Sequence, residues 1–338
     1  MQSTTAPHLN SGIFAKPAIY ETPMPVIIAT HNGSFHADDV IGVAILQLVF
    51  PNHHIIRTRD AEQIAKANFA VDVGGQWDAT LGRFDHHQKG FEGARQSGVV
   101  YASAGLVWAA YGTHCLAPWA KYLNEQNVAD IANAIDDELM QHLDMADTGA
   151  SKGAPGIFGL SALLSQYNST WFEENCMEKE EREALKLERF LEAVGVARRL
   201  LQHILADKVS EATAANLVRN SQRLMDGKVL LLGDSGMPWY KVVCNEMPEV
   251  LFVLYPDSTD GQYQIRTVPV EPESFVARAD LPEAWAGLRG KDLADVTGVP
   301  DAVFCHNGCF IGGAASLAGA QALAALALKE LGVTPAEA

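Results

Sequence analysis

Thiols and long apolar runs are both scarce in this sequence. The chain has five cysteines, an odd number, and they are scattered along its length. That pattern argues against a disulfide framework and favours a reducing compartment. Cys305 and Cys309 form a C-x-x-x-C pair, but no second thiol pair completes a structural zinc site, so we interpret them as buried free thiols. No apolar run reaches transmembrane length, which predicts a protein without a membrane span.

Positive charge is also in short supply. The 25 Lys and Arg residues are outnumbered by 41 Asp and Glu residues, and the formal net charge is −16. Broad, sequence-blind binding along duplex nucleic acid needs a basic face, so the net charge argues against that class of function. Phosphorylated substrates stay open, because bound metal ions are the largest local charges in a site and can reverse its sign.

The length of 338 residues predicts two domains, each with its own core. Residues 1–24 mix Pro, Ser, Thr, His and Lys and predict a loose arm without an apolar signal core. We expect a first domain over residues 25–205, linker helices to about residue 225, and a smaller second domain over residues 226–338. The arm favours a cytoplasmic location, with weak organellar targeting as the alternative.

Residues 26–42 read Val-Ile-Ile-Ala-Thr-His-Asn-Gly-Ser-Phe-His-Ala-Asp-Asp-Val-Ile-Gly. The apolar start predicts a buried strand, Asn-Gly predicts a turn, and Asp38 or Asp39 suits the cap of a following helix. His31, His36, Asp38 and Asp39 then share one strand-to-helix loop, where open α/β sheets bind ligands. Two imidazoles and two carboxylates within nine residues suit a metal site.

Further strands bring more such side chains to the same predicted edge. Residues 54–58 and 69–73 read as strands around a short helix capped by Asp60, a spacing that predicts right-handed crossovers and a parallel sheet. Asp72 then lies at the carboxyl end of its strand, on the same edge as His31. Residues 83–88, Arg-Phe-Asp-His-His-Gln, add Asp85, His86 and His87.

A predicted helix over residues 127–146 ends in another acidic pair. Asp144 and Asp147 are three positions apart, so their side chains share one side of the last turn, and Gly149 suits the terminator. Acids at a helix C-terminus oppose the helix dipole. A cation is the simplest partner that would hold them there.

These segments together supply a mixed set of imidazoles and carboxylates that suits Mn²⁺, Fe²⁺, Co²⁺ or Zn²⁺. The set is large enough for two ions, about 3.5–4 Å apart in a two-metal hydrolase, with a carboxylate such as Asp72 as bridge. Two ions would activate water and stabilise an in-line displacement at phosphorus. The hypothesis of a metal site depends on the convergence of these residues at one edge of the sheet, because each residue taken alone has a simpler explanation. Asp72 alone suits a turn, Asp39 suits a helix cap, and Asp85 suits an orienting role behind an imidazole.

The second half reads as a smaller α+β domain, with strands predicted at residues 229–232, 250–255, 262–268 and 302–305 and a helix over 317–331. His306, Asn307, Gly312 and Gly313 lie between the last strand and that helix. Free backbone N–H groups and a helix N-terminus there would suit a phosphate, and Arg266 in the same domain would add charge. The alternative is that the glycines only form a tight turn.

The motifs resemble those of two related groups. In chain order, His31 to Asp38, Asp72, Asp85-His86-His87 and Asp147-Thr148-Gly149 resemble the four motifs of the DHH phosphoesterase superfamily. Residues 30–39, 71–75, 84–88, 275–289 and 310–313 resemble the melanocyte-proliferating-gene protein family more closely, and the match runs from about residue 26 to the C-terminus. That family is often labelled "metal-dependent protein hydrolase" and contains 3′-to-5′ RNA exonucleases.

The resemblance implies a fold and a set of roles. It implies an N-terminal parallel-sheet DHH-like catalytic domain, a C-terminal substrate-binding domain, and an active site in the cleft between them. His31, Asp38, Asp72, His86 and Asp147 are similar to the family's metal ligands, with Asp72 as the bridge and manganese as the favoured ion. His87 is similar to the histidine that faces substrate. Gly312-Gly313 stands where relatives have a glycine-rich substrate segment. His36 departs from the superfamily, which usually has an acid there.

Three functions follow as hypotheses. The first is a two-metal phosphodiesterase, a 3′-to-5′ exonuclease on RNA, short oligonucleotides or other small phosphate esters, as a monomer or homo-oligomer. The second is a metal-dependent peptide or amide hydrolase. The third is a non-catalytic metal- or nucleotide-binding regulator. An intact ligand set argues against the third hypothesis. The second hypothesis lacks support, because the sequence shows no pocket signature for an acyl substrate.

Overall fold

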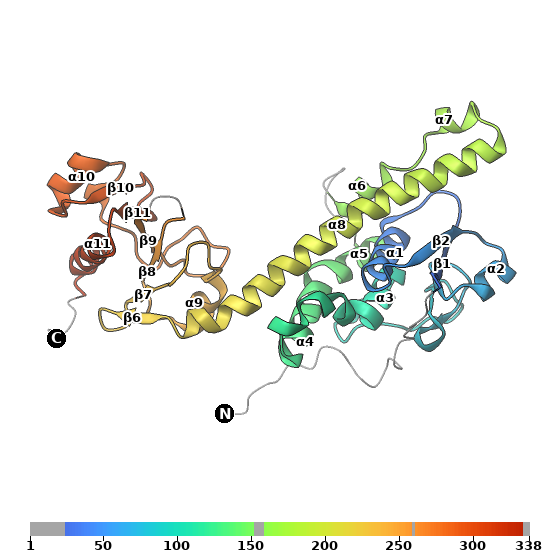
Figure 1. Cartoon of the computed structure of the whole chain (residues 1–338), viewed down its shortest axis with the longest axis horizontal. Helices are drawn as coiled ribbons and strands as arrows, with labels where there is room; N and C mark the ends of the chain where they lie inside the picture. The colour runs from blue at the N-terminus through green and yellow to red at the C-terminus, as the bar shows by residue number, and fades with distance from the viewer. Residues whose placement is uncertain (1–23, 152–158, 259–260, 334–338) are drawn as a thin grey trace. The chain divides into compact units, whose positions relative to one another are not determined.

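The computed structural model describes residues 24–151, 159–258 and 261–333 (Figure 1). It is a mixed α/β protein with two β-sheets, and the chain divides into two compact units, Met1–Val209 and Ser210–Ala338. The expected arm lies outside the described residues except for Met24. Among the helices of the described ranges, none combines the length and the apolar character that crossing a membrane requires.

The first unit contains a five-stranded sheet of order β2-β1-β3-β5-β4. Its strands are β1 (Val26–Thr30), β2 (His53–Arg57), β3 (Phe69–Val71), β4 (Trp77–Asp78) and β5 (Arg83–Phe84). β1, β2 and β3 run parallel, which confirms the prediction for these three strands. β5 also runs parallel to β3, whereas the short β4 is antiparallel to β5, and neither of these pairings was predicted. The carboxyl ends of β1, β3 and β5 therefore meet at one edge of the sheet.

Helices and helical turns make up most of the rest of this unit. They are α1 (Ala37–Val49), α2 (Ala61–Lys66), η1 (Ala79–Leu81), α3 (Ser103–Tyr111), η2 (Gly112–Tyr122), α4 (Glu125–Ile135), the π-turn η3 (Asp136–Met140), α5 (Gln141–Asp147), α6 (Leu160–Ser165), α7 (Trp171–Asn175) and most of α8 (Lys179–Arg219), whose last turns belong to the second unit. The predicted helix over 127–146 corresponds to α4, η3 and α5 in sequence, and Asp60 caps α2 as expected. The N-cap position of α1 is His36 and not Asp38 or Asp39, but Asp39, the third residue of the helix, accepts from the His36 backbone N–H as half of a capping box.

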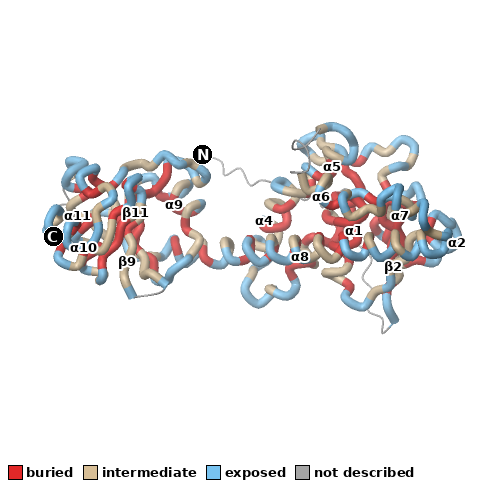
Figure 2. Tube along the Cα trace, turned by 90° about the horizontal axis from the view of Figure 1, so that it is seen from above, coloured by how far each residue is buried: buried red, intermediate tan, exposed pale blue. Residues whose placement is uncertain are grey.

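Helices cover both faces of this sheet. α1 is buried at every position from Ala37 to Leu46, as Figure 2 shows by its colour. It approaches β3 so closely at Gly42 that an added Cβ would lie 2.7 Å from Cγ1 of Val71. On the opposite face Ile64 of α2 packs with Ala29 and Ala70 of the strands. Because α1 is fixed against the sheet in this way, the side chains of its first turn have a defined position at the strand ends.

The second unit contains a six-stranded sheet of order β10-β11-β9-β8-β7-β6, antiparallel except between β7 and β8. Its elements are β6 (Gln222–Leu224), β7 (Val229–Leu231), α9 (Tyr240–Glu246), β8 (Phe252–Pro256), β9 (Tyr263–Thr267), η5 (Glu283–Trp285), α10 (Gly290–Thr297), β10 (Ala302–Cys305), β11 (Ile311–Ala314) and α11 (Leu317–Glu330). One face packs against α10 and α11, and the other packs against α9 and the end of α8. The alternation of Phe252, Val253 and Leu254 between these two cores is the period-two pattern of a strand buried on both faces.

Candidate metal centre

The loop between β1 and α1 carries the first group of polar side chains. His31, Asp38 and Asp39 are buried, whereas His36 is exposed. The Asp39 carboxylate accepts a hydrogen bond from the His36 backbone N–H at 2.9 Å, and its other oxygen lies 3.3 Å from Nε2 of His31. Asp39 was predicted to be a cap. The helix begins earlier than expected, and one Asp39 oxygen caps its start while the other faces the first histidine.

Asp72 lies between three imidazoles that come from two different segments. Its carboxylate oxygens are 3.4 Å from Nε2 of His31, 3.7 Å from Nε2 of His86 and 3.2 Å from Nδ1 of His87. Its backbone has a φ of 56°, a left-handed conformation that a non-glycine residue adopts at a cost. The turn after β3 thus points this carboxylate back across the strand ends.

The segment after β5 holds Asp85, His86 and His87. Asp85 accepts hydrogen bonds from the backbone N–H groups of Gly75 and His87 at 2.6 and 2.9 Å. Its Oδ1 also lies 2.9 Å from Nδ1 of His87, whose side chain is 64% exposed. Asp85 therefore fixes the ring of His87, whereas Nε2 of His86 is buried 3.3 Å from Oδ2 of Asp147.

Asp38 is held at the N-terminus of α3. Its two oxygens accept hydrogen bonds from the backbone N–H groups of Ser103 and Ala104, at 2.9 and 2.6 Å. Ser103 also donates from its hydroxyl to Asp72 at 3.2 Å. The positive end of a helix dipole favours a carboxylate there. Sequence reasoning missed Ser103, although a small polar residue at a helix start was a usable signal.

Among the described residues, three groups each bring possible ligand atoms within 4.8 Å of one another. They are Asp72, His86 and His87; His31, Asp39 and Asp72; and Asp38, His86 and Asp147. Asp72 and His86 each belong to two of the groups. The group of His31, Asp39 and Asp72 is buried, whereas the other two groups each include one exposed residue, His87 or Asp147. Such imidazole and carboxylate clusters can hold divalent metal ions.

The residues at this site also fit a cation electrostatically. Asp39 Oδ2 and His86 Nε2 are buried with no hydrogen-bond partner among the residues that the structure describes. Burial raises the pKa of Asp38 well above its usual range, and the charge of Asp72 raises that pKa further. Burial raises the pKa of Asp39 to about 6. A cation would supply both the missing partners and the compensating charge.

Two predicted ligands lie outside the three groups. The buried Asp144 carboxylate accepts hydrogen bonds from Arg95 Nη1 at 2.7 Å and from the Gly105 backbone N–H at 3.1 Å. Arg95, which sequence reasoning did not single out, also pairs with Asp136 at 2.7 Å. His36 is exposed, with its ring centroid 6.3 Å from that of His31. Metal ligation by Asp144 and His36 remains a prediction.

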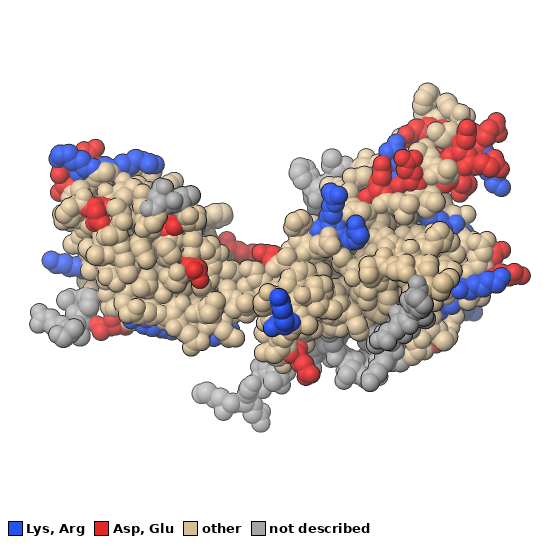
Figure 3. Space-filling view, in the orientation of Figure 1, with Lys and Arg blue, Asp and Glu red and all other residues tan. Residues whose placement is uncertain are grey.

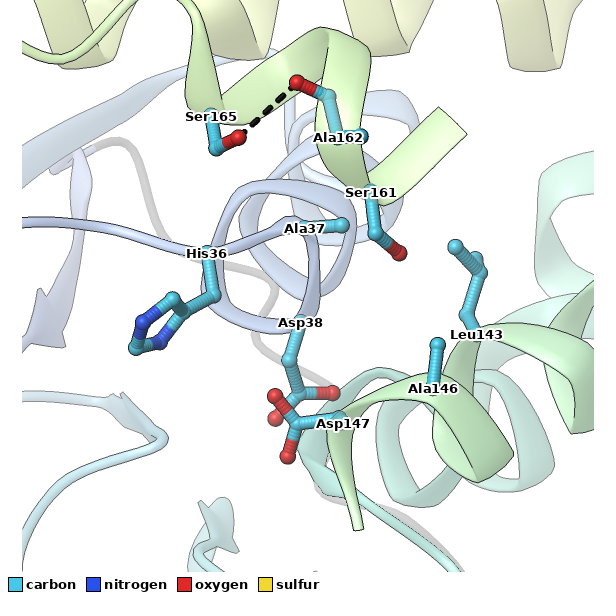
Figure 4. A pocket seen from close by; sticks show the side chains of 9 residues that line it. All are labelled: His36, Ala37, Asp38, Leu143, Ala146, Asp147, Ser161, Ala162 and Ser165. Atoms are coloured by element: carbon cyan, nitrogen blue, oxygen red, sulfur yellow. Dashed lines mark hydrogen bonds between the residues drawn. The ribbon is translucent and has the colours of Figure 1, made fainter. Parts of the chain in front are cut away.

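A pocket opens beside one of these groups. It has a volume of about 410 Å³, and Figure 4 shows the side chains that line it: His36, Ala37, Asp38, Leu143, Ala146, Asp147, Ser161, Ala162 and Ser165. In that view the carboxylates of Asp38 and Asp147 lie close together, and the Ser161 hydroxyl points into the space above them. The pocket therefore adjoins the group formed by Asp38, His86 and Asp147.

In the second unit, the prediction that Gly312 and Gly313 lie in a loop was wrong. Gly312 and Gly313 are buried in β11, which pairs with β9 on one side and β10 on the other, so they do not form a free turn before a helix. The reason for glycine is close packing: a Cβ on Gly313 would lie 2.9 Å from the Phe304 ring. A phosphate cradle made of their N–H groups loses its geometric basis.

The other predicted substrate residues in this unit are more accessible. His306 and Asn307 are exposed in the turn between β10 and β11. The His306 ring centroid is 4.4 Å from that of Phe310. The guanidinium of Arg266 lies 5.4 Å from the Tyr240 ring centroid and 5.5 Å from that of Phe310. Their binding roles remain predictions.

Comparisons with known proteins agree along the chain. Residues 27–328 match the MYG1 exonuclease family model, described as "Uncharacterised protein family (UPF0160)". The chain is 33% identical to the MYG1 exonuclease of Mus musculus, over 90% of this chain and 86% of the mouse protein. It is 31% identical to the MYG1 exonuclease of Homo sapiens, covering 92% and 88% of the two chains, and 31% identical to a MYG1 protein of Caenorhabditis elegans, covering 90% and 96%. The chain therefore belongs to the melanocyte-proliferating-gene family, MYG1.

Proposed function

We propose that this protein is a metal-dependent phosphodiesterase, a 3′-to-5′ exonuclease that acts on RNA or short oligonucleotides. The observation that carries the proposal is the convergence of buried imidazoles and carboxylates at the carboxyl ends of β1, β3 and β5. The exonuclease names of the mouse and human relatives support the same reaction class. We further propose that the first unit is the DHH-like catalytic domain and that the second binds substrate.

The metal-holding residues in this proposal are His31, Asp38, Asp72, His86 and Asp147, with Asp39 added because its free oxygen faces His31. Asp72 belongs to two ligand groups, which suits a bridging carboxylate. When bound, two ions, of which we favour manganese, would supply a water of lowered pKa and charge stabilisation at phosphorus.

His87 and Asp85 are proposed to act on the substrate side. The His87 side chain is exposed, and its Nδ1 faces the Asp85 carboxylate, which leaves Nε2 as the atom for a substrate oxygen. Asp85 is itself fixed by two backbone N–H groups, so it can hold the ring in one orientation. His87 would then stabilise or protonate the leaving oxygen.

The acidic surface of the first unit supports the proposal that the substrate enters by one end. Figure 3 shows acidic side chains gathered around α7 and the first turns of α8, where Glu178, Glu180, Glu181 and Glu183 are exposed. Such a surface repels a phosphate backbone. A substrate that enters by a free single-stranded terminus would not need to lie along that surface.

The test combines metal analysis with product analysis. Purified protein is dialysed, loaded with manganese, and incubated with RNA labelled at the 5′ end. We expect stepwise shortening from the 3′ end and release of 5′-mononucleotides. Release of amino acids from a peptide library, with RNA left intact, would replace this proposal by amide hydrolysis. Bound metal without turnover of either substrate would favour a regulator.

A further inference from the structure

The proposed function assigns no role to the other side chains that line the pocket beside Asp38 and Asp147. Leu143, Ala146 and Ala162 form an apolar part of its wall, and its volume of about 410 Å³ lies near the lower end of the range for small-ligand sites, roughly 300–1,000 Å³. A space of that size suits one nucleotide rather than a longer strand. A scissile phosphate next to Asp38 and Asp147 would leave the sugar of the terminal nucleotide in this pocket.

Two serine hydroxyls line the pocket, and they differ in one respect. The Ser165 hydroxyl donates a hydrogen bond to the Ala162 carbonyl at 2.8 Å, inside its own helix (Figure 4). The Ser161 hydroxyl has no hydrogen bond to any residue in the described part of the chain, and it points into the pocket (Figure 4). Only Ser161 has both its donor and its acceptor capacity available for a ligand.

We propose that Ser161 binds the ribose 2′-hydroxyl of the terminal nucleotide and thereby makes the site prefer RNA over DNA. This inference rests on the proposed function, since it places the substrate's phosphate at the candidate metal centre. A 2′-hydroxyl is both donor and acceptor, and it is the group by which a protein distinguishes RNA from DNA at a given site. Ser161 offers the matching pair of roles beside an apolar wall suited to the sugar ring.

The first measurement is equilibrium binding, which does not depend on turnover. Manganese-loaded protein is titrated calorimetrically with adenosine 5′-monophosphate and with 2′-deoxyadenosine 5′-monophosphate. We expect the ribonucleotide to bind about 3- to 10-fold more tightly, the ratio that one hydrogen bond supplies. Ser161→Ala should reduce that ratio to about one. Ser165→Ala, the matched control, should retain it, because the Ser165 hydroxyl is already used within the helix.

Several outcomes overturn the inference. They are equal binding of the two nucleotides by the wild type, an unchanged ratio in Ser161→Ala, or an equal loss in Ser165→Ala. The same variants are then assayed on an RNA whose 3′-terminal nucleotide alone is 2′-deoxy. The wild type should be slowed by that change and Ser161→Ala should not, a cycle that isolates the contact. A ribose preference through Ser161 without any RNA hydrolysis would reject the phosphodiesterase proposal and keep the nucleotide site.

Discussion

The Asn168 side chain hydrogen-bonds to both polar backbone groups of Phe35. Its Oδ1 accepts from the Phe35 N–H and its Nδ2 donates to the Phe35 carbonyl, each at 2.9 Å, across 133 positions of sequence. In the same loop, the carbonyls of His31 and Gly33 accept hydrogen bonds from Arg57 at 3.1 and 2.9 Å. The loop that carries His31 and His36 is therefore held by two side chains from outside it.

Removing the Asn168 side chain should loosen that loop. Asn168→Ala leaves the N–H and carbonyl of the buried Phe35 without their partner, a cost of about 1–3 kcal/mol in the free energy of unfolding. Metal affinity should fall about 10- to 100-fold, as for other residues that orient ligands. Urea unfolding and manganese titration measure the two effects. Asn168→Asp, which keeps the acceptor for the Phe35 N–H, should lie between wild type and Ala; wild-type stability and affinity in the Ala variant would contradict the assignment.

Asp72→Asn tests the proposed bridge. The amide fits the left-handed backbone but removes the charge shared by two ligand groups, so bound metal should drop and turnover should be lost. Elemental analysis after dialysis and a mononucleotide-release assay measure this. Full metal content with an unchanged rate would disprove the bridging role.

His87→Ala should separate chemistry from metal binding. A histidine that assists the leaving oxygen contributes roughly 10²-fold or more in rate, so kcat should fall by that amount while metal content stays constant. The structure makes this a sharp test, because His87 Nδ1 is also near Asp72, in one of the ligand groups. Loss of metal together with activity would instead make His87 a ligand.

The metal-free protein should lose stability as the pH rises from 5.5 to 8. Burial raises the pKa of Asp39 to about 6 and that of Asp144 to about 7. Burial alone would lower the pKa of His31, but its hydrogen bond to Asp72 and the charge of Asp39 raise it overall. A raised pKa in the folded state means that the protonated form is favoured there, so its contribution is present at low pH and lost as pH rises through these values.

His86 opposes this trend, because burial and the charge of His87 lower its pKa. The groups with raised pKa outnumber it, and we expect the free energy of unfolding to fall by about 1–3 kcal/mol over that interval. Urea titrations at four pH values, with a chelator present, measure the slope. Saturating manganese should flatten or reverse it. A chelated protein that becomes more stable at pH 8 would show that the buried carboxylates are not the dominant groups.

Local patterns in the sequence predicted the parallel strands of the first unit well, because apolar β-branched runs and strand spacing determine them. They could not decide between Asp38 and Asp39 as cap, since the helix begins at a histidine that no capping preference singles out. The pairing of Asp144 with Arg95 was also beyond local reasoning. Asp144 and Asp147 share a helical turn, and only a contact across 49 positions distinguishes them.

The prediction for Gly312-Gly313 in the second unit failed for a different reason. Gly-Gly is typical of a loop or turn, and Gly312-Gly313 was predicted to lie in a phosphate-binding loop, with a tight turn as the alternative. In the structure, the Phe304 ring and the Phe304 carbonyl occupy the space that side chains at these two positions would need. A Cβ on Gly312 would lie 3.0 Å from the Phe304 carbonyl oxygen. Close approach inside a sheet and freedom in a loop both require glycine, and the sequence alone does not distinguish them.

The left-handed backbone of Asp72 has a consequence for how this position tolerates variation. Glycine adopts that conformation without steric cost, whereas aspartate adopts it at a cost. A library randomised at residue 72 and selected only for resistance to proteolysis, at an alkaline pH where neutral imidazoles do not offset the buried carboxylate, should therefore enrich Gly. The same library selected for turnover should return Asp. At this one position, the best residue for folding and the best residue for chemistry are different amino acids.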